Sequence, residues 1–111
     1  MKYRVHITTK AEADIDEVLY YIETELLNPQ ASDRLYEKIA KELRSLNYMP
    51  EKHQISTDPV LKSHGIRYIV IESYLAFFII DQENKTVHII RFIYGKRDWV
   101  RILRNDPLSL E

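Results

Sequence analysis

Hydrophobic residues in the first half of the chain recur at the spacing of amphipathic helices. They form two apolar stripes: Ile15, Val18, Leu19, Ile22 and Leu26, and then Leu35, Ile39, Leu43 and Leu46. We expect the first helix to start at Thr9, because Glu12 three residues later completes a Thr-x-x-Glu capping box. Asn28-Pro29 ends this helix and begins the second, since Asn is a good N-cap and Pro fits the first helical position. The short joint between them predicts an antiparallel helical hairpin.

The remaining apolar residues form short runs typical of strands, at residues 3–8, 66–71, 74–80 and 86–94. Connections of only a few residues join the last three runs, so we expect antiparallel neighbours. These runs are almost continuously apolar, which predicts burial on both faces of the sheet. Residues 49–64 are polar and contain Pro50 and Pro59, so they are interpreted as a surface loop. Residues 98–104 predict a short helix, and the tail from Asn105 is expected to fray.

The elements therefore follow the order β-α-α-β-β-β-α. This order predicts an α+β fold, with a small antiparallel sheet covered on one face by the helical hairpin. A chain of 111 residues suits one hydrophobic core, and we interpret residues 1–111 as a single domain.

Several classes of protein lack support in the sequence. There is no cysteine, which fits a reducing cytoplasm, and the N-terminal residues do not resemble a signal peptide. Residues 75–80 are the longest apolar stretch, far too short to cross a membrane. The four histidines are scattered, and no glycine-rich phosphate loop is present. We therefore expect no metal and no cofactor.

Charge is unevenly distributed although the net charge is only −1. Residues 11–42 hold nine acidic and three basic side chains, whereas residues 85–104 are basic apart from Asp98. This asymmetry favours equally a face for an anionic partner and an ordinary solvated basic surface.

One basic and aromatic cluster lies around the end of the last predicted strand. Its candidate catalytic residues, if the protein is a nuclease, are Arg97, Lys96, Arg67 and Arg91. Its candidate target- or RNA-binding residues are Tyr94, Arg101 and Arg104. Such side chains can hold a phosphate backbone, stack on a base and stabilise the charge of a phosphoryl-transfer transition state. The alternative is that Arg97 pairs with a helix carboxylate and that Trp99 fills the core. We favour the structural interpretation for Trp99 and the functional one for Arg97 and Lys96.

An ordered set of motifs resembles the RelE/ParE superfamily of bacterial toxins. In the first half these are Tyr3-Arg4-Val5-His6-Ile7-Thr8, Ala11-Glu12-Ala13-Asp14-Ile15, Tyr20-Tyr21-Ile22 and Leu27-Asn28-Pro29-Gln30-Ala31-Ser32. In the second half they are Gly65-Ile66-Arg67-Tyr68, residues 74–78, Val87-His88-Ile89-Ile90-Arg91-Phe92-Ile93-Tyr94 and Lys96-Arg97-Asp98-Trp99. The resemblance covers residues 3–104. It implies a cytoplasmic toxin with the same order of elements, neutralised by a small antitoxin.

The superfamily divides into two activities. RelE-like members cut mRNA on the ribosome without a metal, and ParE-like members poison DNA gyrase. By resemblance, one nuclease arginine aligns with Leu75 and the nuclease tyrosine with Leu103, whereas another arginine matches Arg97. Because the nuclease set is incomplete, we favour a ParE-like, plasmid-stabilisation type of gyrase poison. An RNA-cleaving toxin, in which Arg67, Arg91 and Tyr94 substitute for the missing groups, is the alternative, and an inert relative is the third.

Overall fold

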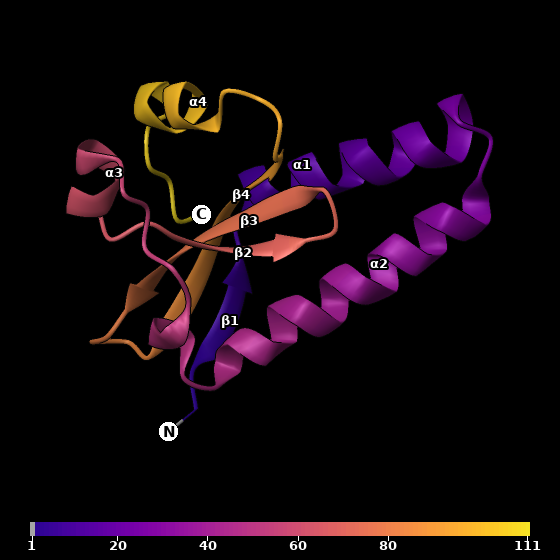
Figure 1. Ribbon diagram of the computed structural model, residues 1–111. Helices are drawn as coiled ribbons and strands as arrows, with labels where there is room; N and C mark the ends of the chain where they lie inside the picture. Colours follow the sequence, from indigo (N-terminus) through magenta and orange to yellow (C-terminus); the bar gives the residue numbers. More distant parts are fainter. Residues whose placement is uncertain (1) are drawn as a thin grey trace.

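A four-stranded sheet with the order β1-β4-β3-β2 forms the centre of the computed structural model, which describes residues 2–111 (Figure 1). Its strands are β1 (Arg4–Ile7), β2 (Arg67–Ile71), β3 (Tyr74–Asp81) and β4 (Thr86–Tyr94). The predicted antiparallel pairing of β2, β3 and β4 is confirmed. The first strand runs parallel to β4, because the helical hairpin after it crosses over before the chain returns to the sheet. The sheet is therefore mixed.

The helical hairpin consists of α1 (Thr9–Tyr20), a π-helical turn (Tyr21–Glu25) and α2 (Pro29–Arg44). Asn28 caps α2 as predicted, and its side chain accepts a hydrogen bond from the Ala31 N–H at 3.1 Å. The predicted capping box at the start of α1 is wrong by one residue. The hydroxyl of Thr8 accepts from the Ala11 N–H at 3.2 Å and donates to the Ile89 carbonyl at 2.8 Å. Thr8 is the better cap because it also joins the helix to β4.

The π-helical turn changes which residues face the core at the end of the hairpin. The Leu26 N–H donates to the Tyr21 carbonyl, five residues earlier, and this wider turn rotates the helix face. As a result Leu26, expected in the apolar stripe, is 56% exposed. The hairpin then reverses through Leu27, whose φ of 50° lies in the left-handed region.

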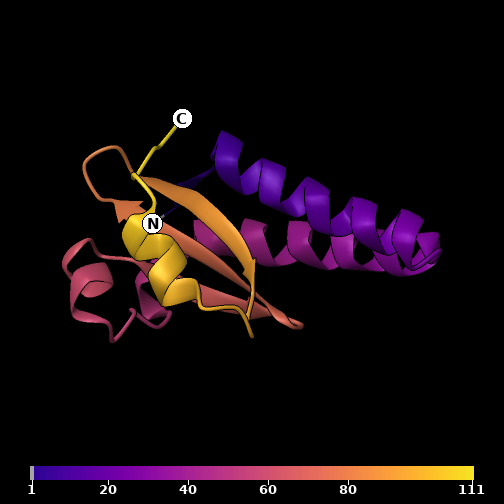
Figure 2. The same ribbon diagram turned by 90° about the horizontal axis from the view of Figure 1, so that it is seen from above.

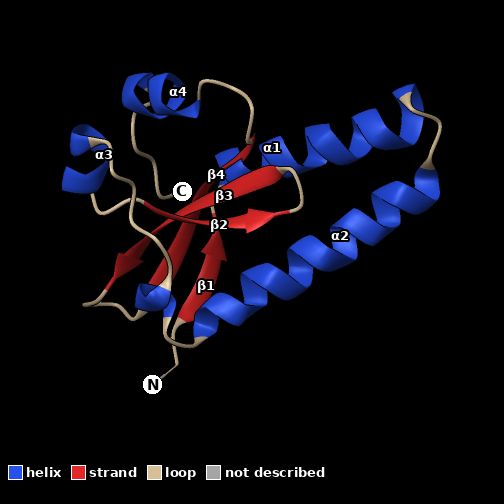
Figure 3. Ribbon diagram, in the orientation of Figure 1, coloured by secondary structure: helices blue, strands red, loops and turns tan. Residues whose placement is uncertain are grey.

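Both faces of the sheet are buried, as its continuous apolar runs predicted. On one face the stripe of α2 packs with Ile15 of α1 against residues such as Ile69 and Phe78. On the other face α4 (Trp99–Asn105) and α3 (Pro59–Ser63) cover Phe77 and Ile90 (Figures 2 and 3). The sheet is thus the middle layer of three.

Two segments differ from the sequence-based prediction. The supposed loop at residues 49–64 contains a 3₁₀ turn (Pro50–Lys52) and α3. Asp58 caps α3 by accepting from the Leu61 N–H at 3.1 Å, so Asp58-Pro59 is a start signal of the same kind as Asn28-Pro29. The tail expected to fray instead turns back, and the Glu111 backbone oxygen accepts from the Thr9 hydroxyl at 3.2 Å.

Replacing Thr8 by valine tests the joint between α1 and β4. Thr8→Val keeps the volume of the buried side chain but removes both hydrogen bonds. We expect the free energy of unfolding to fall by about 1–3 kcal/mol in urea denaturation, since buried partners lose their bonds. Thr9→Val is the matched control, because its hydroxyl is exposed, and should change stability by no more than about 0.5 kcal/mol. Equal effects of the two changes would contradict this assignment of the cap.

Two histidines meet across the parallel pair of strands. The Nδ1 atoms of His6 and His88 are 2.9 Å apart, so one ring donates to the other and only one proton lies between them. Burial lowers the pKa of His88 below its ordinary 6.5, and His6 lowers it further, against the opposing effect of Asp81. When the pH falls, a second proton binds the His6–His88 pair, although the surroundings of His88 favour its neutral form.

The histidine pair makes stability depend on pH. Because the pKa of His88 is lower in the folded than in the unfolded chain, its contribution is complete above about pH 6.5 and is lost as the pH falls below that value. We expect urea denaturation to show a smaller loss of stability on acidification in His88→Gln than in the native sequence. An identical pH dependence for both proteins would refute this role.

Candidate functional site

The chain between β4 and α4 forms a tight turn that presents two basic side chains. The Arg97 N–H donates to the Tyr94 carbonyl at 3.0 Å, and the Gly95 N–H donates to the Ser73 carbonyl at 2.8 Å. A Cβ atom on Gly95 would lie 3.2 Å from that same carbonyl oxygen, so only glycine fits without a shift. Lys96 and Arg97 follow, and both are exposed.

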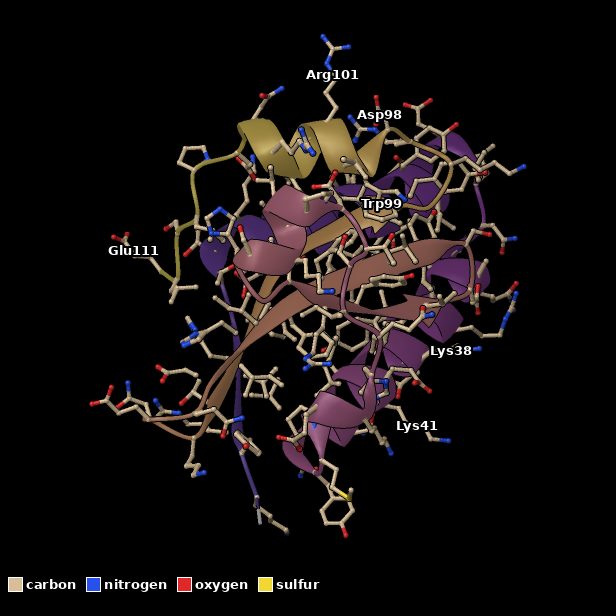
Figure 4. The ribbon with its side chains drawn as sticks, turned by 60° about the vertical axis from the view of Figure 1, so that its left-hand side comes forward. Lys38, Lys41, Asp98, Trp99, Arg101 and Glu111 are labelled. Atoms are coloured by element: carbon tan, nitrogen blue, oxygen red, sulfur yellow. The ribbon has the colours of Figure 1, made fainter. Side chains whose placement is uncertain are left out.

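Three cations of this region have no acidic partner among residues 2–111: Lys96, Arg97 and Arg101. The nearby carboxylate of Asp98 is engaged as the N-cap of α4, where it accepts from the Arg101 N–H at 3.3 Å. In Figure 4 the side chain of Arg101 points away from the protein, whereas Trp99 points beneath α4 toward the sheet. We refer to Tyr94, Lys96, Arg97 and Arg101 as the β4–α4 surface.

Arg91 is held within the fold by two carboxylates. Its Nε atom lies 2.7 Å from a carboxylate oxygen of Asp14, and one terminal nitrogen lies 2.6 Å from Asp106. Burial alone would lower the pKa of Arg91, but the hydrogen bonds to both carboxylates outweigh it and raise the pKa. The pairing with a helix carboxylate that the sequence allowed for Arg97 is made by Arg91 instead, with Asp14 of α1.

Arg67 and Arg104 are also engaged in holding the fold together. Arg67 donates to the backbone carbonyls of Glu51 and His53, at 3.1 and 2.7 Å. It pairs with Phe78 on β3, roughly 13 Å along the strand from the end where Tyr94 lies. Arg104 makes two hydrogen bonds to Asp58, and these lower the pKa of that carboxyl.

Both positions aligned with nuclease residues lie in the hydrophobic core. Leu75 and Leu103 are 9% and 6% exposed, and they belong to the cluster beneath α3 and α4. Trp99 packs into the same cluster, with its ring 5.2 Å from that of Phe77, which confirms its predicted role in packing. Tyr94, Lys96, Arg97 and Arg101 are therefore exposed at the end of β4, in the turn after it and on α4. Arg67, Arg91 and Arg104 instead make hydrogen bonds within the fold.

Sequence reasoning missed two groups of aromatic and apolar side chains outside the basic cluster. The ring of Tyr74 lies 5.0 Å from Phe92 and 5.7 Å from Tyr94. Burial raises the pKa of the Tyr74 phenol, and nearby Tyr94, Glu72 and Tyr21 raise it further. At the end of the hairpin four large residues are exposed: Tyr20, Tyr21, Leu26 and Leu27. The adjacent tyrosines outside the apolar stripe of α1 were the available signal.

Two further properties bear on function. Among residues 2–111, no cluster of three or more histidine, cysteine or acidic side chains is arranged to hold a metal ion. Within the same part of the chain, no helix is both long enough and apolar enough to cross a membrane.

Comparison with known families identifies the chain. A family model described as the ParE toxin of the type II toxin–antitoxin system, parDE, matches residues 5–99. The chain belongs to the ParE toxin family. The match spans the sheet, the hairpin and the basic turn, and ends at Trp99. The resemblance to the RelE/ParE superfamily is thereby confirmed. No curated protein sequence matches the chain significantly.

Solved structures of this toxin superfamily share the fold. The chromosomal ParDE toxin–antitoxin system from P. aeruginosa gives a TM-score of 0.69 at 21% identity, covering 86% of this chain and 98% of that one. The RelBE2 complex from Mycobacterium tuberculosis gives 0.55 at 20% identity, with coverages of 85% and 99%. A mutant of the E. coli toxin RelE in the free state gives 0.59 at 15% identity, with coverages of 96% and 100%. The predicted α+β fold is confirmed.

Removing the charge of Arg91 should reduce stability strongly, whereas removing that of Arg97 should have little effect. Arg91→Met leaves Asp14 and Asp106 without their cation in a largely buried site, so we expect a loss of about 3 kcal/mol in urea denaturation. Arg97→Met should change stability by less than about 0.5 kcal/mol, because the side chain is exposed. A stable Arg91→Met protein would show that the network contributes little.

Proposed function

We propose that this ParE-family chain inhibits growth by poisoning DNA gyrase and that a cognate antitoxin neutralises it. The observation that carries the proposal is the burial of Leu75 and Leu103 in the core. The two positions at which nuclease relatives are expected to carry an arginine and a tyrosine hold apolar side chains that are buried and have no group for acid–base or phosphate chemistry. Binding to a protein target requires no such groups.

The β4–α4 surface is the proposed contact with the target. Its three cations have no acidic partner among the described residues, and Tyr94 adds a 39% exposed aromatic ring. Arginine and tyrosine are enriched at the centres of protein interfaces, where their stems and rings bury apolar area. The phosphates of DNA bound to gyrase are acidic groups that the cations of the β4–α4 surface would complement.

Ribosome-dependent cleavage of mRNA is the alternative, and the free Lys96 and Arg97 favour it. Both can stabilise a scissile phosphate. The other cations proposed for cleavage are less available, since Arg91 binds two carboxylates and Arg67 binds two carbonyls. Cleavage would need at least two cations around one phosphate, and Arg91 and Arg67 are not available to join Lys96 and Arg97 there. Contact with a protein target has no such requirement.

The proposed antitoxin site is the groove between β1 and the helical hairpin. It has a volume of about 460 Å³, and its lining includes Val5, Ile7, Ile15, Tyr36, Ile39 and Leu43. β1 is an edge strand and leaves one side of its backbone unpaired. An extended or helical antitoxin segment would bury these apolar side chains in the cytoplasm.

A supercoiling assay with purified gyrase, relaxed plasmid DNA and ATP tests the target. We expect the native toxin to inhibit supercoiling and to accumulate cleaved DNA. Lys96→Ala/Arg97→Ala should require about tenfold more protein for the same effect, because the β4–α4 surface loses two contacts.

The matched control is Lys38→Ala/Lys41→Ala, which removes the same charge from the outer face of α2 (Figure 4). This variant should retain full inhibition. Unchanged supercoiling at a large excess of native toxin, together with cleavage of mRNA on translating ribosomes, would replace the gyrase proposal by the nuclease alternative.

A further inference from the structure

Two imidazole rings meet at the edge of the sheet. His6 of β1 and His88 of β4 are partners in the parallel register, and their Nδ1 atoms are 2.9 Å apart. Their ring planes cross at 89°. The expectation of no metal rested on the scattered positions of the histidines, but the fold brings together these two, which are 82 positions apart in the chain. Because neutral imidazole is the commonest metal ligand in proteins, the pair is a candidate site.

The distance between the two nitrogens matches one type of coordination geometry. Two imidazole nitrogens in cis positions, at about 90° and each about 2.05 Å from a metal ion, lie about 2.9 Å apart. The wider angle at a tetrahedral ion separates them by about 3.3 Å. Cu(II) and Ni(II) prefer square-planar or tetragonal geometry, whereas Zn(II) prefers tetrahedral geometry. The 2.9 Å between the rings of His6 and His88 therefore favours Cu(II) or Ni(II) over Zn(II).

Asp81 favours the form of His88 that can bind a metal ion. Its carboxylate lies 3.8 Å from Nε2 of His88, and it accepts two hydrogen bonds from Asn84, at 2.8 and 3.1 Å, which hold it in place. A negative charge on that side of the ring favours a proton on Nε2 and leaves the lone pair of Nδ1 free. Metal-binding histidines commonly have such a carboxylate behind them, which orients the ring and makes it a stronger ligand.

The surroundings of the pair leave room for an ion with water on its outer side. Both histidines are only half-buried and β1 is an edge strand, so water can fill the coordination positions that the protein leaves open. Burial and the neighbouring His6 lower the pKa of His88, so at neutral pH an ion need not displace a proton from a charged ring. Arg4 lies two positions along β1 on the same face, but its side chain is exposed and can extend into solvent.

We propose that His6 and His88 form a chelating site for a divalent transition-metal ion, Cu(II) or Ni(II), with water in the remaining positions. The ion replaces the hydrogen bond between the rings, and the Nδ1 proton of the donating ring moves to its Nε2 by exchange with water. Because the two ligands come from β1 and β4, the ion joins these strands and stabilises the folded chain relative to the unfolded one. The site is independent of the target that the toxin binds.

Titration of the untagged protein with nickel chloride and with copper chloride tests the site. We expect one equivalent of either ion to bind, the thermal midpoint to rise with ion concentration, and the EPR spectrum of bound Cu(II) to show coupling to two nitrogen nuclei. His6→Gln should remove one nitrogen from the spectrum and weaken binding by more than about a hundredfold, because it removes a ligand. Asp81→Asn should keep both nitrogens and weaken binding by about tenfold, because it removes only the charge behind His88.

His64→Gln is the matched control. His64 is likewise a histidine, but it is exposed and lies at the end of α3. The variant should keep the affinity for Ni(II), the rise of the thermal midpoint and the EPR spectrum of the native protein.

Three results would overturn the proposal. Equal affinity of the native protein and of His6→Gln for Ni(II) would show that the pair does not chelate the ion. An equal loss of affinity in His64→Gln would show adventitious binding to surface histidines. A fall of the thermal midpoint with added ion would show that the ion prefers the unfolded chain.

Discussion

The carboxylate of Asp14 accepts a hydrogen bond from the part of β4 that extends beyond the shorter strand β1. β4 has nine residues but β1 only four, and their pairing ends where Ile7 meets Ile89. The rest of this edge of β4 would expose backbone groups to the interior. Asp14 of α1 accepts from the Phe92 N–H at 3.0 Å, and the same carboxylate binds Arg91. The Asp14 side chain thus takes the place of a strand partner for Phe92, and its bonds fix the position of α1 on the sheet.

The same ion network decides which cations are available for function. Arg91 bridges α1 and the tail through Asp14 and Asp106, and Arg104 joins α4 to α3 through Asp58. These pairs lie where two elements meet and a carboxylate is within reach. The turn after β4 has no carboxylate to spare, because Asp98 caps a helix. Lys96 and Arg97 therefore remain free for an external partner.

Periodicity was enough to predict the two helices, the three antiparallel strands and the burial of both faces of the sheet. Local sequence signals did not decide between two neighbouring residues that can each play the same role. Thr8 and Thr9 are both good caps, and only the contact with Ile89, distant in sequence, favours Thr8. The basic cluster was predicted as one group, but Arg67 and Arg91 differ from Arg97 only in their tertiary neighbours. Such neighbours cannot be read from one sequence without its fold.

The pairing of β1 with β4 has a consequence for biosynthesis. Their side chains meet across 82 positions of sequence, as between His6 and His88, so β1 waits without a partner while most of the chain is made. Contacts of such long range are slow to form and close the sheet late. The hairpin, made of local contacts, can form on the nascent chain well before the sheet is complete. The sheet can therefore be completed only after the segment that carries β4 has been made.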